Sequence, residues 1–401
     1  RFISHNILLA LFFTFIIVCS IPAYAANGIQ LIGIGAVHRG LGGAGVAKPL
    51  DSTAIYLNPA GMNNVGRRFD LNFTMAFPKT AMNTTPAGGN AVKSEDEGSL
   101  LPSATLVYTF MDDKIAAGIG AIFSSGFGVD YPASRLPSVL TGNTYDTSDR
   151  YGLLKIIPAF SYRILDNLYA GVGVHINYAF LQTNSAVATF TQTTGTGRFD
   201  PAIGIGASFG LIYEPLDWLS LGTTYTSRQY FERFRRYKDL LAESLDMPQQ
   251  VAAGVAVTPI KGGTIMADFR WINWSGIGQL GDSPAAGGFG WRDQYVLGAG
   301  LQYNFKDHFD VPVAIRTGYN YGRSPIAPAS VYANALVPAV IEHHLSGGIS
   351  VQLTKNIGLD GSYTRGFKNT VTDNGAISGV PGSTLSTQAH FFTLQLNVSC
   401  K

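Results

Sequence analysis

The chain has 401 residues, enough for one large domain or two ordinary ones. Only 13% of the residues are charged, about half the usual share, which argues against an ordinary soluble protein. The net charge of +2 gives no indication of nucleic-acid binding. After the first two dozen residues no run of 18 apolar residues occurs, which argues against membrane-spanning helices. Short segments rich in glycine, phenylalanine and tyrosine instead favour a membrane β-barrel, in which only alternate residues face lipid.

The N-terminus has the features of a secretory signal. Arg1 precedes an apolar run over 7–18, and Ala23-Tyr24-Ala25 matches the small-x-small cleavage pattern. We therefore expect residues 1–25 to be a signal peptide and the mature chain to begin at Ala26, with a permanent membrane anchor as the alternative. Cys400 is then the only cysteine left, so no internal disulfide is expected.

Alternation with a period of two dominates from about residue 67 onward. In one example, Leu168, Ala170, Val172, Val174, Ile176, Tyr178 and Phe180 share a face, opposite Tyr169, Gly171, Gly173, His175, Asn177 and Ala179. A soluble β-sandwich also alternates, but its outer face carries charges. Here the second face is small or uncharged, as expected for residues that point into a barrel lumen.

Counting such segments predicts about fourteen strands. They lie near 67–78, 101–111, 114–126, 151–165, 167–181, 198–214, 217–228, 247–259, 262–275, 291–305, 311–322, 340–354, 356–367 and 388–400. Short turns alternate with longer polar or glycine-rich loops, as in outer-membrane barrels with periplasmic turns and extracellular loops. The sequence therefore predicts an all-β fold, a transmembrane antiparallel barrel over residues 67–401 with both ends in the periplasm.

Residues 26–66 do not alternate and contain the glycine-rich GLGGAG at 40–45 and DSTAIYLNPAGM at 51–62. A lumen as wide as that of a fourteen-strand barrel leaks unless something fills it. We therefore predict that this segment is a hatch, a plug inside the barrel. Gly40, Gly42 and Gly45 match the spacing of a dinucleotide-binding turn, but no βαβ unit follows them.

The hatch segment with its Asn58-Pro59-Ala60-Gly61 resembles the FadL/TodX-type outer-membrane transport proteins. The same resemblance continues in YRILDNLYAGVGV at 162–174, MPQQVAAGVAV at 247–257, ADFRWINWS at 267–275, WRDQYVLGAGLQY at 291–303, VPVAIRTGYNYG at 311–322 and HHLSGGIS at 343–350. It implies a monomer in the outer membrane of a Gram-negative bacterium, in contact with lipid and lipopolysaccharide, that takes up long-chain fatty acids or hydrocarbons passively. We expect no cofactor, no metal and no enzymatic activity. The ending Ser399-Cys400-Lys401 departs from the aromatic last residue common in such barrels.

The resemblance also implies a route. The substrate would bind in an extracellular groove, pass the hatch and leave sideways where the third strand kinks, near the Asn58, Pro59, Ala60 and Gly61 stretch. By this resemblance the third strand is 114–126. Its Gly118, Gly120 and Gly126 are residues that permit a bend in a sheet. The alternative is that these glycines only relieve crowding inside the barrel.

Apolar residues in the loop 229–246, including Phe231 and Phe234, recur at near-helical spacing with arginines between them. This pattern predicts an amphipathic helix. We expect it to form an apolar outer groove flanked by cations suited to a carboxylate or a lipopolysaccharide phosphate. The alternative is a helix that only caps the barrel or rests on the lipid surface.

Strand parity places five polar side chains on the lumen face: Lys155, His175, Asp268, Arg270 and Arg316. A charge facing lipid would cost roughly 2–4 kcal/mol at the membrane midplane. We hypothesise that Lys155, Arg270 or Arg316 binds the carboxylate of a substrate. The alternative is that Asp268 and Arg270 pair with each other or with the hatch.

Three other functions compete. An outer-membrane lipid hydrolase needs a nucleophile beside a histidine, yet His175 has no obvious serine partner and no H-x-x-x-H spacing occurs. A general hydrophilic porin needs an unplugged, charge-lined lumen, whereas the predicted lumen face is sparsely charged. A structural or adhesive role is the third alternative.

Overall fold

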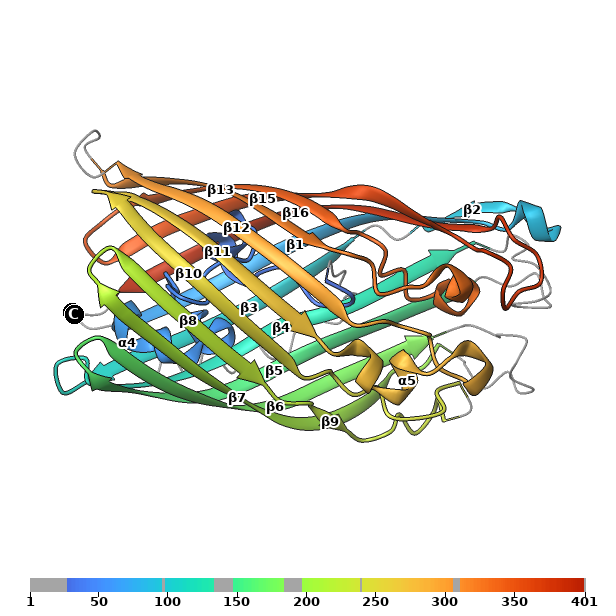
Figure 1. The fold of residues 1–401 in the computed structure, drawn as a ribbon, viewed down its shortest axis with the longest axis horizontal. Coiled ribbons are helices and arrows are strands. Elements are labelled where there is room, and N and C mark those ends of the chain that lie inside the picture. The colour runs from blue at the N-terminus through green and yellow to red at the C-terminus, as the bar shows by residue number, and fades with distance from the viewer. Residues whose placement is uncertain are drawn as a thin grey trace.

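The computed structural model describes residues 27–95, 98–132, 147–183, 197–238, 240–305 and 311–399. In these ranges fourteen long antiparallel strands form a closed barrel (Figure 1), because the last strand pairs with the first. They are β1 (Arg68–Asn83), β3 (Ser99–Phe110), β4 (Ile115–Tyr131), β5 (Thr147–Leu165), β6 (Leu168–Thr183), β7 (Asp200–Leu216), β8 (Leu219–Thr226), β10 (Gln250–Ile260), β11 (Gly263–Ile272), β12 (Gln294–Phe305), β13 (Val313–Gly322), β14 (His343–Gln352), β15 (Ile357–Thr372) and β16 (Thr384–Ser399). Two short strands, β2 (Ala91–Lys93) and β9 (Tyr230–Phe231), extend the sheet at one end. The predicted barrel and its strand count are confirmed.

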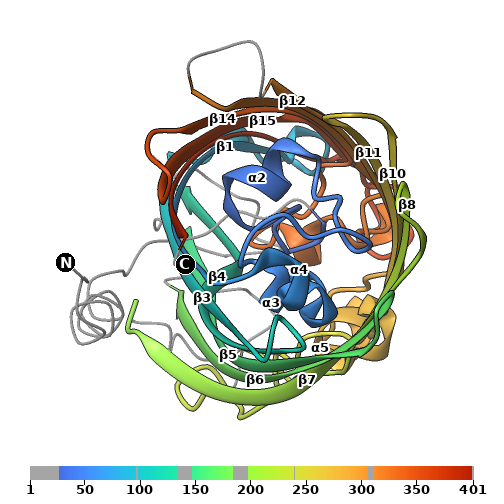
Figure 2. The ribbon, with the colours of Figure 1, turned by 90° about the vertical axis from the view of Figure 1, so that its left-hand side faces the viewer.

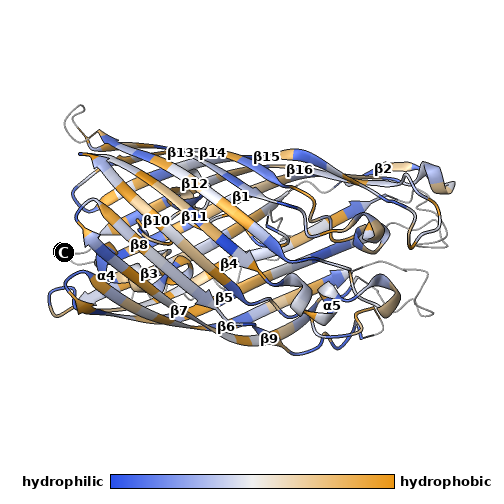
Figure 3. Cartoon of the chain, in the orientation of Figure 1, coloured by the Kyte–Doolittle hydropathy of each residue, from blue (hydrophilic) through white to orange (hydrophobic). Residues whose placement is uncertain are grey.

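Burial alternates along most strands, as the sequence pattern predicts. On β16, Phe392 and Leu394 are 49% and 70% exposed, whereas Thr393 between them is 1% exposed. Apolar residues recur along the strands (Figure 3), and many of them are exposed on the outside of the wall, where lipid would cover them.

The two ends of the barrel differ. Short turns join strands at the end to the left in Figure 1, and longer loops lie at the other. The loops carry short helical turns: η2 (Thr85–Ala87), η3 (Trp274–Gly276), α5 (Gly278–Gly281), η4 (Pro284–Ala286), η5 (Pro328–Ser330) and η6 (Tyr332–Asn334). In outer-membrane barrels the short turns are periplasmic and the long loops extracellular.

None of the helices in the described ranges has the length and apolar character needed to cross a membrane.

The N-terminal segment fills the lumen (Figure 2), which confirms the predicted hatch. It contains α2 (Gly35–Gly40), α3 (Ala54–Leu57), η1 (Pro59–Gly61) and α4 (Met62–Val65). Wall glycines allow its backbone to approach closely. A Cβ added at Gly318 of β13 would lie 2.1 Å from the backbone nitrogen of Gly42, and one at Gly171 of β6 would lie 2.4 Å from that of Ala60. The small lumen-facing residues of the sequence pattern therefore make room for the hatch.

The helix predicted over 229–246 is wrong, since the described residues of this loop form none. Tyr230 and Phe231 instead form β9, which pairs with β7, and the carboxylate of Asp246 accepts a hydrogen bond from Phe231 N (2.9 Å). The apolar residues are nevertheless buried, as the pattern suggests: Phe231, Phe234, Tyr237, Leu241 and Leu245. An irregular loop folded over the barrel mouth buries residues at the same spacing as a helix would.

Candidate functional site

The wall is interrupted between β3 and β4. The two strands pair from Phe110 and Ile115 as far as Ser103 and Ile122, but β4 continues to Tyr131 without β3. The pairing of β4 with β5 shifts by one residue between Phe123 and Ser125, which makes Ser124 the extra residue of a β-bulge. This irregularity lies in the strand for which the sequence predicts a kink.

The hatch occupies the edge of β4 that β3 leaves. Leu31 N donates to Ser124 O (3.1 Å), and Gly126 N donates to Ile29 O (3.0 Å). Gln30 and Ser125 form a β-bridge between these two hydrogen bonds. Every residue of β4 from Gly120 to Val129 is buried, so the alternation of the other strands is lost here. The middle of the break is thus closed by three hatch residues, whereas at the far end of β4 Glu95 N donates to Asp130 O (2.8 Å).

Of the predicted gate glycines, only Gly126 lies at the break. Gly118 and Gly120 pair with Val107 and Thr105 in the regular part of the β3–β4 ladder. A Cβ at Gly118 would come within 2.9 Å of Ile55 in α3. This glycine therefore gives the hatch room, which is the alternative stated for it above.

The Asn58-Pro59-Ala60-Gly61 stretch lies away from the break, against β5, β6 and β7. Asn58 Nδ2 approaches the carbonyl oxygens of Val46 (2.8 Å), Leu211 (3.2 Å) and Thr223 (3.3 Å). Its Oδ1 accepts a hydrogen bond from Ala60 N (3.1 Å). These hydrogen bonds tie the stretch to the strands that follow β4 and β5 around the wall, and the residues that pair with β4 at the kink are instead Ile29–Leu31.

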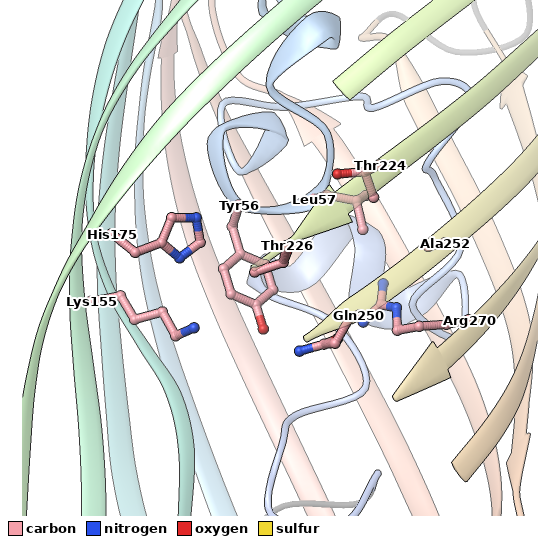
Figure 4. Close-up of a pocket in the computed structure, with 9 residues that line it drawn as sticks. All are labelled: Tyr56, Leu57, Lys155, His175, Thr224, Thr226, Gln250, Ala252 and Arg270. Carbon is pink, nitrogen blue, oxygen red and sulfur yellow. The ribbon is translucent and has the colours of Figure 1, made fainter. Parts of the chain in front are cut away.

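Two of the three predicted carboxylate-binding cations line one cavity (Figure 4). Lys155 of β5 and Arg270 of β11 face it from opposite sides, with Tyr56 of α3 between them. Lys155 Nζ donates to Gln229 Oε1 (2.8 Å). Burial raises the pKa of Tyr56, against an opposing effect of Arg270, so its hydroxyl stays a neutral donor. The cavity measures about 20 Å³, room for about one water molecule.

Arg316 lies elsewhere. Its Nε donates to Gln302 Oε1 (2.5 Å), and its Nη1 is 3.9 Å from the carboxylate of Asp360. It lines a separate cavity of about 160 Å³ together with Arg68. The protein itself therefore supplies polar partners for Arg316.

Asp268 binds the hatch. Its Oδ2 accepts hydrogen bonds from Gly45 N (2.8 Å) and Val46 N (3.0 Å). Among the described residues no ion pair joins Asp268 to Arg270. Of the two partners that the sequence left open for Asp268, the structure shows the hatch.

A large apolar cluster fills the loop end of the barrel. It includes Phe231 and Phe234 together with Trp274 and Trp291, whose rings lie 5.0 Å apart. Beside the break, a small apolar cavity of about 10 Å³ is lined by Ile29, Phe127 and Ile341, among others. Sequence reasoning did not select Ile29, which lies in no alternating segment or motif, or Ile341, which lies at the start of the predicted strand 340–354 and carries no polar group.

Solved structures share this architecture. The Pseudomonas putida toluene transporter TodX is 17% identical, with a TM-score of 0.72 over 92% of this chain and 99% of that one. The Ralstonia pickettii toluene transporter TbuX is 19% identical, with a TM-score of 0.67 over 91% and 98%. A Pseudomonas aeruginosa FadL homologue is 16% identical, with a TM-score of 0.68 over 93% and 99%. No curated protein matches the chain. A family model matches residues 16–399, and the chain therefore belongs to the outer membrane protein transport protein (OMPP1/FadL/TodX) family.

Proposed function

We propose that this protein carries hydrophobic molecules, long-chain fatty acids or hydrocarbons, passively across the outer membrane and releases them sideways through the barrel wall. The observation that carries the proposal is the end of the β3–β4 ladder at Ser103 and Ile122. Beyond it, Ile29–Leu31 of the hatch pair with the middle of β4, and Ser94 and Glu95 bond to Asp130 near its far end. A few hatch residues can move away more readily than a strand of the barrel. The two similar structures described as toluene transporters support the substrate class.

The chemistry of such a substrate favours this exit. Each CH₂ group moved from an apolar site into water costs about 0.8 kcal/mol. A path straight through the barrel would cross the hydrogen-bonded polar groups of the hatch, such as Asn58 and Asp268. Passage from the apolar cluster at the loops to the apolar cavity at Ile29, and then into lipid, avoids that cost.

Deletion of Ser124 tests the proposal. Without this residue, Phe123 and Ser125 would pair with Leu154 and Leu153 in continuous register, and every other β4–β5 pair would be kept. We expect the straightened β4 to pair further with β3 and to close the break. Uptake of radiolabelled oleate and toluene is measured in cells whose own transporters have been deleted, and it should fall to the level of cells without this protein.

Ser124→Ala is the matched control, because it removes the hydroxyl and keeps the bulge. It should retain uptake. Heat-modifiable migration in gel electrophoresis shows whether each variant forms the barrel. Normal uptake by a folded deletion variant would exclude the lateral exit. Large small-solute conductance of the wild-type protein in a planar bilayer would favour the hydrophilic porin instead.

A further inference from the structure

Arg39, in α2 of the hatch, is a buried cation to which the described part of the chain offers no counter-charge. Its side chain is 1% exposed. Nη2 donates to Gly33 O (2.9 Å), whereas Nε and Nη1 have no hydrogen-bond partner. In the described ranges no carboxylate forms an ion pair with it. Burial lowers its pKa to about 10, so the guanidinium stays charged at neutral pH.

Such an arrangement is costly in a folded protein. A buried charge ordinarily has a charged partner and a full set of hydrogen bonds, because removal from water costs several kcal/mol. The cation–π contact of Arg39 with the ring of Phe391, 5.2 Å from its centroid, supplies only part of this compensation. The N–H groups on Nε and Nη1 therefore remain available as donors to an anion.

The surroundings of Arg39 connect it with the break in the wall. Phe391 belongs to one apolar cluster with Ile341 and Ala389. These two residues line the small cavity that also contains Ile29 and Gly126. Phe391 and Ala389 are both buried on β16, and two residues of a strand span roughly 7 Å. A tail that passes the break beside that cavity could thus have its head group at Arg39.

A second buried group points to the same place. His344 of β14 is fully buried, and neither ring nitrogen forms a hydrogen bond of ordinary geometry within the described ranges, although the Asn320 carbonyl lies close enough for a weak one. It lies near enough to Arg39 for their charges to interact. A Cβ added at Gly366 would be 3.2 Å from the His344 ring and 3.3 Å from Ile341. Arg39 and His344 thus lie beside the apolar cluster that contains Phe391 and Ile341, on one side of the lumen.

We propose that Arg39 is the receptor for the carboxylate of an amphipathic substrate whose apolar tail lies towards the break at β4. The N–H groups on Nε and Nη1, together with the second N–H of Nη2, can donate to the two oxygens of a carboxylate. The inference rests on the proposed function, and it deepens that function by assigning the substrate a carboxylate. It also places the head group on the hatch, whereas the sequence directed attention to wall cations.

The test compares two ligands of equal chain length, oleate and oleyl alcohol, by calorimetric titration of the purified full-length barrel. Hydrogen bonds to a charged group contribute about 1.5–3 kcal/mol. Arg39→Gln should therefore weaken oleate binding about tenfold or more and leave oleyl alcohol binding nearly unchanged. Arg39→Lys keeps the charge but loses the planar guanidinium, so its oleate affinity should lie between that of the wild type and that of Arg39→Gln. It also serves as the test variant if Arg39→Gln does not fold.

Arg163→Gln is the control, since it removes one arginine at a periplasmic turn, where Arg163 Nη2 bonds to Asp112 O. Undiminished oleate binding in Arg39→Gln, or an equal loss for both ligands, would overturn the assignment. Weakened oleate binding in Lys155→Met but not in Arg39→Gln would move the receptor to the cavity of Lys155 and Arg270. If the wild type binds neither ligand and cells with it take up neither, the proposed function itself fails.

Discussion

The hatch contacts the wall in two different ways, at β6 and β7 and at the break between β3 and β4. Between β6 and β7 the ladder is unbroken from Leu168 and Tyr213 to Leu181 and Asp200, and the hatch packs against it through Asn58 and Pro59. Between β3 and β4 the ladder ends early, and Ile29–Leu31 take over the backbone pairing of β4. The first contact holds the hatch by side chains against a complete wall. The second completes the wall with the hatch itself, so movement of these residues would open it.

The largest effect is expected at the β6 contact. In Gly171→Ala the new Cβ would lie 2.4 Å from Ala60 N and from Pro59 C, both of which are backbone atoms. Overpacking of this kind costs about 1–3 kcal/mol and at times more. We expect the hatch to be displaced and planar-bilayer conductance for small ions to rise. In Gly347→Ala the nearest atom would be 3.9 Å away, so this control should stay closed. Equal conductance of the two variants would show that β6 does not hold the hatch.

Asn58→Ala should come second. It removes the hydrogen bonds that join Val46, Leu211 and Thr223 through one amide. A buried group left without its partner costs about 1–3 kcal/mol, so amide exchange of hatch peptides, followed by mass spectrometry, should accelerate about tenfold or more. Asn64→Ala loses only an exposed hydrogen bond to Glu214 and is the control. Unchanged exchange in both variants would contradict the anchoring role of Asn58.

Asp268→Asn should have a smaller effect. The neutral amide oxygen can still accept one of the hydrogen bonds from Gly45 N and Val46 N, but without the strength that a charged acceptor adds. We expect faster exchange confined to residues 41–47, by less than in Asn58→Ala. Asp217→Asn, at an exposed position of a short turn, should leave the exchange of that segment unaltered. Acceleration throughout the hatch would mean that Asp268 supports the whole plug.

Period-two alternation made the strands and the lumen position of Lys155 and His175 predictable, because burial on one face is a local property of a strand. The convergence of Lys155 with Arg270 was not predictable, since it depends on how β5 and β11 face each other across the lumen with Tyr56 between them. The loop 229–246 misled the prediction because spacing alone does not distinguish a helix from a folded loop. The pairing of Ile29–Leu31 with β4 depends on where the β3–β4 ladder ends. The end of a ladder has no periodic pattern by which the sequence could reveal it.

The smallest change in amide exchange is expected at Gln30. Its direction shows whether side chains hold the hatch at the break as they do at the Asn58 contact. Gln30 is 1% exposed, yet neither atom of its amide has a hydrogen-bond partner, unlike the amide of Asn58. Replacement of an unpartnered buried amide by an apolar group of similar shape is close to neutral or stabilising. Gln30→Met should therefore leave exchange at Ile29–Leu31 unchanged or slower, because the backbone bonds to Ser124 and Gly126 remain. Acceleration as large as that of Asn58→Ala would show that side chains hold the hatch at the break too, and the contrast between the two contacts would be lost.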